Sequence, residues 1–458
     1  MSLNLGPYPN LRHSGLPWLG KLPSHWDVFR NGRLFSQRNE TGFGELPILE
    51  VSLKTGVRVR DMDNLKRKQM MSDREKYKRA AQGDIAYNMM RMWQGAVGVA
   101  PVDGLVSPAY VVMRPLPEVD CRYFSYLFRT ASYMNEVDAY SRGIVKDRNR
   151  LYWQDFKRMP SPVPSVEEQR HITRFLDAVG SQAQRFIRNK RRLIELLKEQ
   201  KQNVINQAVT RGLDPDVKLK PSGVEWIGDI PEHWEVRRLK FLCHNLNEQT
   251  SEKQPGETYI ALEHVESWTG RISLPDDEIT FDSQVKRFQP GDVLFGKLRP
   301  YLAKVTRPQT AGVCVGEFLV LRATGDVTAD FLEQKLRSKR VIDLINSSTF
   351  GAKMPRADWT FIGNLKFAYP SADEQLEILE HIQEKSAEID QAISRAQREI
   401  ELMREYRTRL ISDVVTGQVD VRGIEVPEMT EEELLVLDDD TGESDDVIDD
   451  EGGMDEND

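Results

Sequence analysis

The stretch Gln169–Gly212, QRHITRFLDAVGSQAQRFIRNKRRLIELLKEQKQNVINQAVTRG, decides the fold because it has the pattern of one long amphipathic helix. One stripe of positions advances in alternating steps of four and three, the period of a helix face. The stripe comprises Ile172, Leu176, Val179, Ala183, Phe186, Lys190, Leu193, Leu197, Gln200 and Val204, with Ile187, Ile194, Ile205 and Ala208 beside it. At 1.5 Å per residue this helix would be roughly 60 Å long. We expect it to leave the domain in which it begins and to pair with another helix.

A second copy of this helix follows 206 positions later in the same chain. The pattern Pro-Ser-x-x-Glu-Gln opens both copies, at Pro164 and at Pro370. Ser165 and Ser371 suit helix N-caps, and the Glu three residues after each completes the spacing of a capping box. Two ordinary core helices of similar length are a weaker explanation, because the match extends beyond the helices.

The segment before each helix is also repeated. Ser14–Val28 recurs as Ser222–Val236, an offset of 208, and the same offset aligns Gly83-Asp84-Ile85 with Gly291-Asp292-Val293. Short β-rich runs separated by turn signals fill each copy, and helical stretches follow them. The sequence therefore predicts a tandem duplication of an α/β (α+β) module, each a compact mixed sheet with flanking helices. The repeated His-Trp pair, at residues 25–26 and 233–234, is expected to be a packed aromatic and a satisfied imidazole rather than part of a catalytic site.

The connection between the first helix and the second module is about twelve residues long, from Thr210 to Pro221. The second helix must therefore start near the end of the first, so we expect an antiparallel coiled coil with the modules at its opposite ends and pseudo-two-fold symmetry. The predicted segments are a lead-in (1–13), module one (14–164), spacer helix one (165–211), a linker (212–221), module two (222–370), spacer helix two (371–417) and an acidic disordered tail (418–458).

The charge is distributed unevenly along the chain. The whole chain carries a formal net charge of −9, but its last 31 residues, from Glu428, hold 16 Asp and Glu and no Lys or Arg. The rest of the chain therefore carries +7. Such an acidic block with almost no aromatics predicts a disordered tail, which serves solubility or competes with a polyanion for the basic body.

Cysteine usage and hydropathy indicate a cytoplasmic protein. The three cysteines, Cys121, Cys243 and Cys314, lie far apart and form no metal-binding or disulfide pattern. No signal peptide follows Met1, and no run of 18 apolar residues suggests a membrane span.

Each module carries a cluster of basic, amide and aromatic residues that suits double-stranded DNA. In module one these are Lys54, Arg58, Arg60, Asn88, Arg91, Trp93 and Gln94, with Lys146, Arg148, Asn149 and Arg150 in a loop that begins at Gly143. In module two they are Lys286, Arg287, Lys297, Arg299, Tyr301 and Lys304, with Lys353 and Arg356 in a loop that begins at Gly351. Arg, Asn and Gln can read base edges with two hydrogen bonds, whereas Lys mostly holds phosphate. A single surface charge is ordinarily only solvated, but the paired clusters together indicate a bipartite DNA contact.

Signatures of catalysis are mostly missing from the sequence. It contains no GxGxxG, P-loop, HExxH or GxSxG, and no Asn/Asp-Pro-Pro-aromatic motif for methyl transfer to a flipped adenine. Glu50-Val51-Ser52-Leu53-Lys54 only loosely resembles a nuclease carboxylate-lysine pair, and module two has no counterpart. We therefore expect a chain that recognises DNA without catalysing a reaction and that holds no metal.

The repeated motifs resemble those of the specificity subunit of type I restriction-modification enzymes. The resemblance rests on the duplicated Pro-x-His-Trp-x-Val openings, on Gly291–Leu302 (GDVLFGKLRPYL), and on the Pro-Ser-x-x-Glu-Gln helix starts. It covers about residues 14 to 420, and it is carried by the order and duplication of these motifs.

This resemblance implies target recognition domains that each read one half of a split DNA sequence, with the helices as a ruler between them. It also implies two copies of a methylation subunit as partners, which bring S-adenosylmethionine and methylate adenine. Restriction subunits that use ATP and Mg would join the full complex, so this chain itself would need no cofactor.

The chain departs from the family pattern in two places. Module one has Asn88–Trp93 (NMMRMW) where module two has Gly296–Tyr301 (GKLRPY), so Arg91 and Arg299 are not expected to act alike. The acidic tail is not a feature of the pattern.

Two other classes of function also fit parts of the sequence. A self-contained bipartite DNA-binding regulator fits the basic body but needs no spacer this long. A coiled-coil scaffold for proteins fits the long helices and predicts no salt-dependent affinity for DNA.

Overall fold

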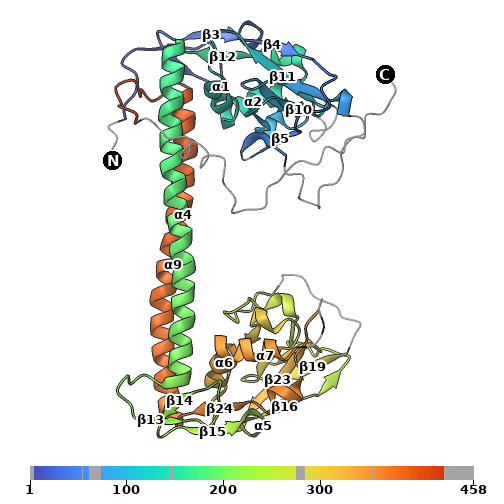
Figure 1. The fold of residues 1–458 in the computed structure, drawn as a ribbon, viewed down its shortest axis with the longest axis vertical. Helices are drawn as coiled ribbons and strands as arrows, with labels where there is room; N and C mark the ends of the chain where they lie inside the picture. Colours follow the sequence, from blue (N-terminus) through green and yellow to red (C-terminus); the bar gives the residue numbers. More distant parts are fainter. Residues whose placement is uncertain are drawn as a thin grey trace. The chain divides into compact units, whose positions relative to one another are not determined.

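The computed structural model describes residues 5–53, 55–60, 74–143, 149–274, 284–349, 351 and 354–427. These residues form two compact units, of which the first combines two segments distant in the sequence and the second is one continuous segment (Figure 1). The first unit falls within Met1–Lys190 and Arg398–Asp458, and the second is Arg191–Gln397. Each unit mixes helices with strands, which agrees with the predicted fold class.

The first unit is built on an antiparallel four-stranded sheet in the order β4-β11-β8-β9. Shorter antiparallel pairs, β1-β2, β3-β12, β5-β6 and β7-β10, surround it. The strands are β1 (Leu11–His13), β2 (Lys21–Pro23), β3 (Asp27–Arg30), β4 (Phe35–Arg38), β5 (Leu49–Ser52), β6 (Gly56–Val59), β7 (Lys78–Ala80), β8 (Ile85–Asn88), β9 (Val97–Val99), β10 (Gly104–Val106), β11 (Tyr110–Pro115) and β12 (Pro160–Val163). The helices are η1 (Asn31–Arg33), η2 (Arg74–Lys76), η3 (Met92–Gln94), α1 (Cys121–Phe128), α2 (Ala131–Tyr140) and α3 (Trp153–Phe156), followed by the long α4 (Val166–Arg211).

The second unit contains the matching antiparallel sheet, in the order β16-β23-β20-β21. A second sheet, β17-β19-β22-β18, includes one parallel pair, and β13-β14 and β15-β24 pair separately. The strands are β13 (Leu219–Pro221), β14 (Asp229–Pro231), β15 (Glu235–Arg238), β16 (Cys243–Leu246), β17 (Gln249–Thr250), β18 (Thr258–Ile260), β19 (Val285–Phe288), β20 (Val293–Gly296), β21 (Val305–Thr306), β22 (Gly312–Val315), β23 (Phe318–Ala323) and β24 (Lys366–Tyr369). The helices are α5 (Leu239–Leu242), η5 (Leu262–His264), η6 (Pro300–Leu302), α6 (Ala329–Arg337), α7 (Lys339–Ser347) and α8 (Trp359–Ile362), followed by the long α9 (Ala372–Val415).

The second unit repeats the elements of the first at the offsets found in the sequence. Strands β8 and β20, strands β11 and β23, and helices α1 and α6 start 208 positions apart, whereas α3 and α8 start 206 apart. The two-residue difference therefore falls in the loops that contain Gly143 and Gly351. The units share the topology of the main sheet, whereas the second sheet of the second unit is replaced in the first unit by the separate pairs β5-β6 and β7-β10. The units differ in length where the sequence placed candidate contact residues.

The repeated Glu of the helix-start motif fixes each long helix to its unit. Glu168 accepts hydrogen bonds from His25 Nε2 at 2.9 Å and from Trp26 Nε1 at 3.1 Å. Glu374 accepts the same two bonds from His233-Trp234, at 2.7 and 2.9 Å. Both tryptophans are fully buried. The tryptophans are thus part of the core, and the exposed histidines are bonded to the glutamate that anchors the helix, in agreement with the prediction of a packed aromatic and a satisfied imidazole.

The capping boxes are only half formed. Ser165 Oγ accepts a hydrogen bond from the Glu168 amide at 3.3 Å, and Ser371 Oγ accepts one from the Glu374 amide at 3.4 Å. The glutamate side chains do not complete the box, because their carboxylates bind the His-Trp pairs. The prediction was right about the N-caps and wrong about the use of the glutamates.

The Gln of the same motif makes a second anchor. Gln169 accepts a hydrogen bond from the Asp120 amide at 2.8 Å, and Gln375 accepts one from the Thr328 amide at 2.8 Å. Each amide nitrogen also donates to the carbonyl of the proline that opens its own motif. Asp120 and Thr328 are the N-caps of α1 and α6, so each glutamine joins a long helix to the same helix of its unit.

Helices α4 and α9 bury a narrow face. In α9 buried residues recur at an interval of seven, at 382, 389 and 396, and in α4 the same interval separates 187 from 194, whereas the next buried apolar residue of α4 is Ile205. The predicted stripe is shifted from the real one: Leu193 and Gln200 are exposed, while Ile194 and Ile205, expected beside the stripe, are buried. In the described part of the chain, neither these helices nor any other could cross a bilayer.

Within each unit the two long helices run antiparallel. In the first unit the start of α4 packs with the end of α9, where Ile172 and Val414 share a core, and Lys190 Nζ lies 2.5 Å from a Glu399 carboxylate oxygen. In the second unit the equivalent ion pair joins Lys201 to Asp390 at 2.7 Å.

The last turn of each long helix is capped by a side chain from the module helix that it contacts. Tyr123 in α1 donates to the Val415 carbonyl at 3.0 Å. Lys335 in α6 donates through Nζ to the Val209 carbonyl. Burial lowers the pKa of Lys335 from its ordinary value of 10.5 to about 7.

Candidate nucleic-acid interface

The strongest candidate contact in the second unit is the turn that follows β20. Arg299 has a left-handed backbone with φ of 50°, which is rare for residues other than glycine. Pro300 disfavours only the right-handed helical conformation of Arg299, and the hydrogen bond from the Arg299 amide to the Pro355 carbonyl at 2.8 Å is the contact that accompanies the left-handed one. The Arg299 side chain is exposed, and no hydrogen bond or ion pair joins it to another described residue. A fixed backbone thus presents an unpaired guanidinium to solvent.

The loop before α8 completes this surface. Leu298 and Arg356 form an antiparallel bridge, and the Ala357 amide donates to the Lys297 carbonyl at 2.9 Å. Arg356 is held by an ion pair with Glu317 at 2.9 Å. The structure therefore brings the predicted Lys297, Arg299 and Arg356 together. Glu317 was not predicted; its only signal was its place in the turn between two β-rich runs.

Tyr301 belongs to the same turn, and its ring is 43% exposed. An exposed aromatic ring beside an arginine suits stacking on a base or packing against a sugar. Lys353 was also predicted here and lies outside the described residues.

Three other predicted residues of the second unit contact groups of the protein itself. Lys286 is only 8% exposed, and its Nζ donates to the Phe318 carbonyl at 2.9 Å. Its burial lowers its pKa, and the prediction that it contacts DNA is wrong. Arg287 faces Glu257, with Nε to carboxylate 3.6 Å, and Lys304 donates to a backbone carbonyl at 2.6 Å. These basic residues support the sheet and the turn.

The first unit forms the same pair of loops with different side chains. The Leu151 amide donates to the Met89 carbonyl at 2.8 Å, the counterpart of the bond from Ala357 to Lys297. Arg91 occupies the place of Arg299 and is exposed, but its backbone φ is −130° and its guanidinium donates to Gln94 Oε1 at 3.2 Å. Trp93 is half-buried and donates to the Met90 carbonyl at 3.0 Å.

Asn88 was predicted to contact DNA, and the structure contradicts this. It is fully buried at the end of β8, and its side-chain oxygen accepts a hydrogen bond from the Met90 amide at 2.8 Å. Asn88 therefore shapes the turn that presents Arg91.

The remaining predicted residues of the first unit fall into three groups. Asn149 and Arg150 border the contact loop: Asn149 donates to Asp138 at 3.5 Å, and the exposed Arg150 pairs through its backbone with Arg142. Arg58 and Arg60 belong to the β5-β6 hairpin, where Arg58 donates to Glu50 at 2.8 Å and the Arg60 amide donates to a backbone carbonyl. Lys54, Lys146 and Arg148 lie outside the described residues.

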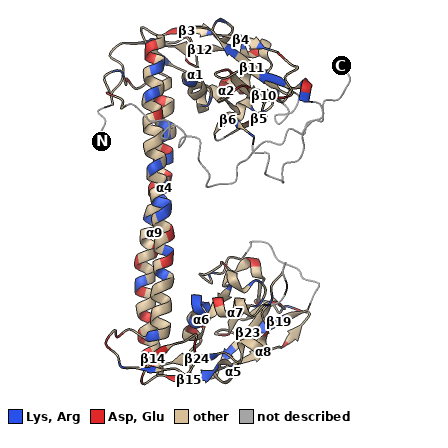
Figure 2. Ribbon diagram, viewed as in Figure 1, with Lys and Arg blue, Asp and Glu red and all other residues tan. Residues whose placement is uncertain are grey.

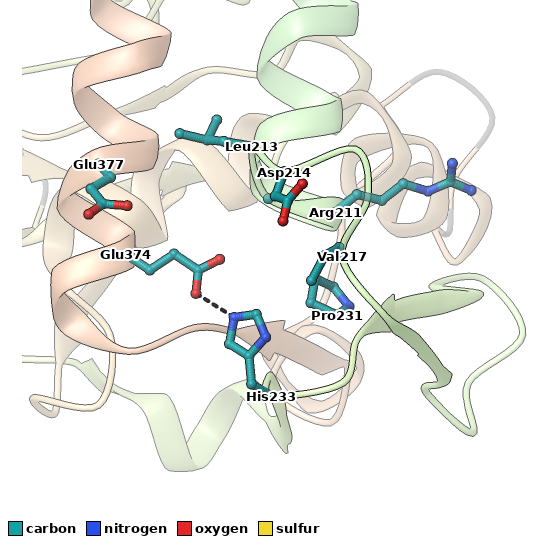
Figure 3. Close-up of a pocket in the computed structure, with 9 residues that line it drawn as sticks. Arg211, Leu213, Asp214, Val217, Pro231, His233, Glu374 and Glu377 are labelled. Carbon is teal, nitrogen blue, oxygen red and sulfur yellow. Dashed lines mark hydrogen bonds and ion pairs between the residues drawn. The ribbon is translucent and has the colours of Figure 1, made fainter.

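A hollow lies beside His233 and Glu374, which anchor α9 in the second unit. Its lining residues are distant in the sequence from the turn after β20 and from the loop before α8. It is lined by Arg211, Gly212, Leu213, Asp214, Val217, Pro231, His233, Glu374 and Glu377 (Figure 3). In the first unit the equivalent glutamate, Glu168, accepts a further hydrogen bond from Tyr8 at 2.8 Å, and Arg422 lies over the Tyr8 ring at 4.9 Å. The hollow thus marks a place where the first anchor has a tyrosine and an arginine and the second does not.

Among the described residues, no group of three or more His, Cys, Asp or Glu side chains is arranged to hold a metal ion. The three cysteines are free thiols, and burial raises the pKa of each to about 12, so none is a reactive thiolate.

No known protein-family model matches the chain. Individual relatives do match it. The chain is 23% identical over 248 residues to the specificity subunit of the type I restriction enzyme EcoDI from Escherichia coli, an alignment that covers 50% of this chain and 55% of that protein. It is 22% identical over 430 residues to a putative specificity subunit, MjaX, from Methanocaldococcus jannaschii, which covers 88% of this chain and 96% of the relative. In the first of these alignments the chain spans only about half the length of the relative.

Solved structures share the fold. A structure described as the basis of complex assembly and conformational transition of the type I R-M system has a TM-score of 0.60 at 15% identity, covering 86% of this chain and 98% of the other. The HsdS subunit from Thermoanaerobacter tengcongensis has a TM-score of 0.50 at 17% identity, covering 86% and 96%. The resemblance found in the sequence is confirmed: the chain is similar to type I specificity subunits.

Proposed function

We propose that this chain, whose relatives are type I specificity subunits, is the DNA-recognition subunit of a type I restriction-modification enzyme. Each unit would act as a target recognition domain that reads one half of a bipartite target in duplex DNA. The chain would carry no catalytic residue of its own, because its role is to choose where partner subunits act.

The observation that carries this proposal is the repeated pair of contact loops. In both units a turn after the third strand of the main sheet is bonded through its backbone to the loop before a short helix, at matching positions. Each turn exposes one arginine, Arg91 or Arg299. A bidentate arginine is the commonest reader of guanine in the major groove, and two such turns provide one reader per half-site.

The long helices would serve as the ruler between half-sites. The interval of seven between buried residues is typical of a coiled coil, and the antiparallel ion pairs within each unit suit such a spacer. Under this proposal the helices set the number of base pairs left unread between the half-sites.

The partners under this proposal are two methylation subunits, and restriction subunits in the full complex. The methylation subunits would bring S-adenosylmethionine and methylate adenine, and the restriction subunits would use ATP and Mg. The duplicated anchors of α4 and α9 support two equivalent docking positions, since each unit offers the same helix start.

Mapping methylated adenines in cells that carry this chain with its methylation subunit tests the proposal. We expect methylation at one bipartite sequence with a fixed gap. Methylation that did not depend on this chain, or tight binding of a bipartite site by the chain alone, would instead favour an independent regulator.

Lengthening both helices tests the ruler. Inserting seven residues into α4 after Lys190 and seven into α9 after Gln397 keeps the interval of the buried face and adds roughly 10 Å, or about three base pairs. The preferred gap should lengthen accordingly. A gap that stayed the same would show that the helices do not set it.

A further inference from the structure

A second basic surface lies in the second unit on strands that the contact loops do not include. It is formed by Arg238 at the end of β15, Lys240 and Phe241 in α5, and Lys366 at the start of β24. Figure 2 draws Lys and Arg in blue. All four side chains are exposed, and Phe241, at 61%, is the most exposed large hydrophobic side chain in the described residues. The backbone holds the group together, since the Lys240 amide donates to the Gly363 carbonyl at 2.9 Å.

The two cations at its centre are directly opposed across the strands. Arg238 pairs with Lys366 in the antiparallel register of β15 and β24, which places both side chains on one face, roughly 5 Å apart at Cβ. Like charges at such positions repel and cost stability. Within the described residues, neither side chain has an acidic partner.

The adjacent cation on the same strand shows the usual alternative. Arg237 forms ion pairs with Asp326 at 2.9 Å and with Glu235 at 3.3 Å. The chain therefore neutralises one arginine of β15 with two carboxylates and leaves its neighbour without any. An unneutralised cross-strand pair indicates that the counter-charge comes from outside the unit.

The first unit has a related basic edge at the equivalent place, but it lacks the opposed pair of cations, because Arg30 faces Pro160 in the register of β3 and β12. Arg30 ends β3, the counterpart of β15, and the Arg33 guanidinium lies over the Phe29 ring at 4.7 Å. The Gly32 amide donates to the Lys157 carbonyl at 2.9 Å, which brings the exposed Arg158 to this edge. Only Arg30 and Arg238 occupy equivalent positions. The combination of unpaired cations with one aromatic ring is kept while the positions of the other cations change.

We propose that these two surfaces, at β15, α5 and β24 and at β3 and η1, bind the phosphate backbone of duplex DNA outside the bases that each unit reads. The proposal rests on the proposed DNA-recognition function and extends it to a part of each unit that carries no base-reading loop. Positioned guanidinium and ammonium groups without fixed carboxylates suit phosphate, and an adjacent aromatic ring suits the sugar face. Such contacts would add affinity and orientation equally for every sequence.

The salt dependence of binding tests this proposal. The full chain, assembled with its methylation subunit, is titrated with a duplex that carries its target and about 20 base pairs on each side, over a range of salt concentrations. Each phosphate contact contributes about −0.9 to the slope of log affinity against log salt. The double variant Arg238→Gln with Lys366→Gln should therefore have a slope shallower by roughly 2, with an unchanged ratio of specific to nonspecific affinity.

The matched control is Arg237→Gln, which removes a neutralised charge on the same strand and should leave the slope unchanged. The melting temperature of the double variant should equal or exceed that of the parent, because a repulsive pair is removed. If the double variant does not fold, Arg30→Gln with Arg33→Gln makes the same test in the first unit.

Three outcomes would overturn the inference. The first is an unchanged slope in the double variant, and the second is a loss of specificity in that variant equal to its loss of affinity. The third is that the double variant loses binding to poly-glutamate but keeps its DNA affinity, which would identify an acidic protein as the partner. Failure of the proposed function is distinguishable, because adenine methylation would then not depend on this chain, or the chain alone would bind its bipartite site tightly, whatever the slope of the double variant.

Discussion

Arg299 in the second unit and Arg91 in the first occupy matching turns, yet their guanidinium groups are presented differently. Arg299 precedes Pro300, bonds to the Pro355 carbonyl and has a left-handed conformation with a free side chain, whereas Arg91 precedes Met92 and donates to Gln94. The backbone scaffold of the two turns is therefore common, and the residue after the arginine decides how the arginine is presented. Under the proposed function, this difference would let the two units read different bases without a change of fold.

The helix anchors differ in the same way. Glu168 accepts three side-chain hydrogen bonds and its side chain is 6% exposed, whereas Glu374 accepts two and is 23% exposed. The first anchor should therefore depend more on its glutamate than the second.

The largest effect on this comparison is expected from Glu168→Ala. It leaves the buried Trp26 indole and the Tyr8 hydroxyl without their acceptor, which should destabilise the first unit by about 3 kcal/mol. Glu374→Ala should cost the second unit about half as much. Hydrogen exchange in the first turns of α4 and α9 reports each unit separately. Equal losses of protection in the two variants would contradict the ranking.

Arg299→Ala should have the next largest effect. Loss of a bidentate contact should cost roughly 1–3 kcal/mol at one position of one half-site and leave the other half-site unchanged. Arg91→Ala should cost less, because Arg91 already uses part of its donor capacity on Gln94. Methylation rates on targets altered in one half-site at a time measure both. An unchanged rate at every site in Arg299→Ala would remove Arg299 from the reading surface.

The two side chains that cap the long helices, Lys335 and Tyr123, should affect the pH dependence of stability differently. Because the pKa of Lys335 is about 7 in the folded unit and about 10.5 unfolded, the unfolded chain binds the extra proton between these values. Stability of the second unit is therefore lost as pH falls from 10.5 towards 7, by at most about 1.4 kcal/mol per pH unit. Urea unfolding between pH 7 and 9 should show this slope, and Lys335→Met should reduce it to the contribution of Lys286, whose pKa burial also lowers. The cap of the first unit, Tyr123, should add no slope in this range, and Tyr123→Phe serves as the control.

The smallest effect is expected from removing residues 428–458. The 16 acidic residues of this segment should compete with DNA for the basic body of both units. Their removal should raise nonspecific affinity for DNA severalfold at low salt, with no effect at high salt, where charge is screened. Filter binding at two salt concentrations measures this. Equal affinities of the full and shortened chains at low salt would leave the segment as an aid to solubility.

The large-scale organisation was predictable because each copy of a repeated motif supports the interpretation of the other copy. Two copies of Pro-Ser-x-x-Glu-Gln at one offset, and two His-Trp openings at another, identified the long helices and the α/β units before any coordinate was known. The offset also located the loops where the units differ in length, although not the bond from Leu151 to Met89 that holds one of them.

The orientation of individual side chains was not predictable. Asn88 and Lys286 are buried because each lies in a strand with both faces covered, and residue type alone does not reveal which polar groups find a partner inside. Leu193 and Ile194 are adjacent on a helix, and a difference of 100° in direction decides which is buried. The surface around Arg238 was missed because its significance lies in the pairing with Lys366, more than a hundred residues away.

Gln169 and Gln375 join their helices to their units through the same two kinds of backbone group, the amide of an N-cap residue and the carbonyl of a proline. A joint that is identical at both ends does not depend on which bases its unit reads. If each unit reads one half-site, as proposed, recombination between two genes at the codons of this joint would exchange whole units while keeping the joint, and a new target sequence could arise in one step from two old ones.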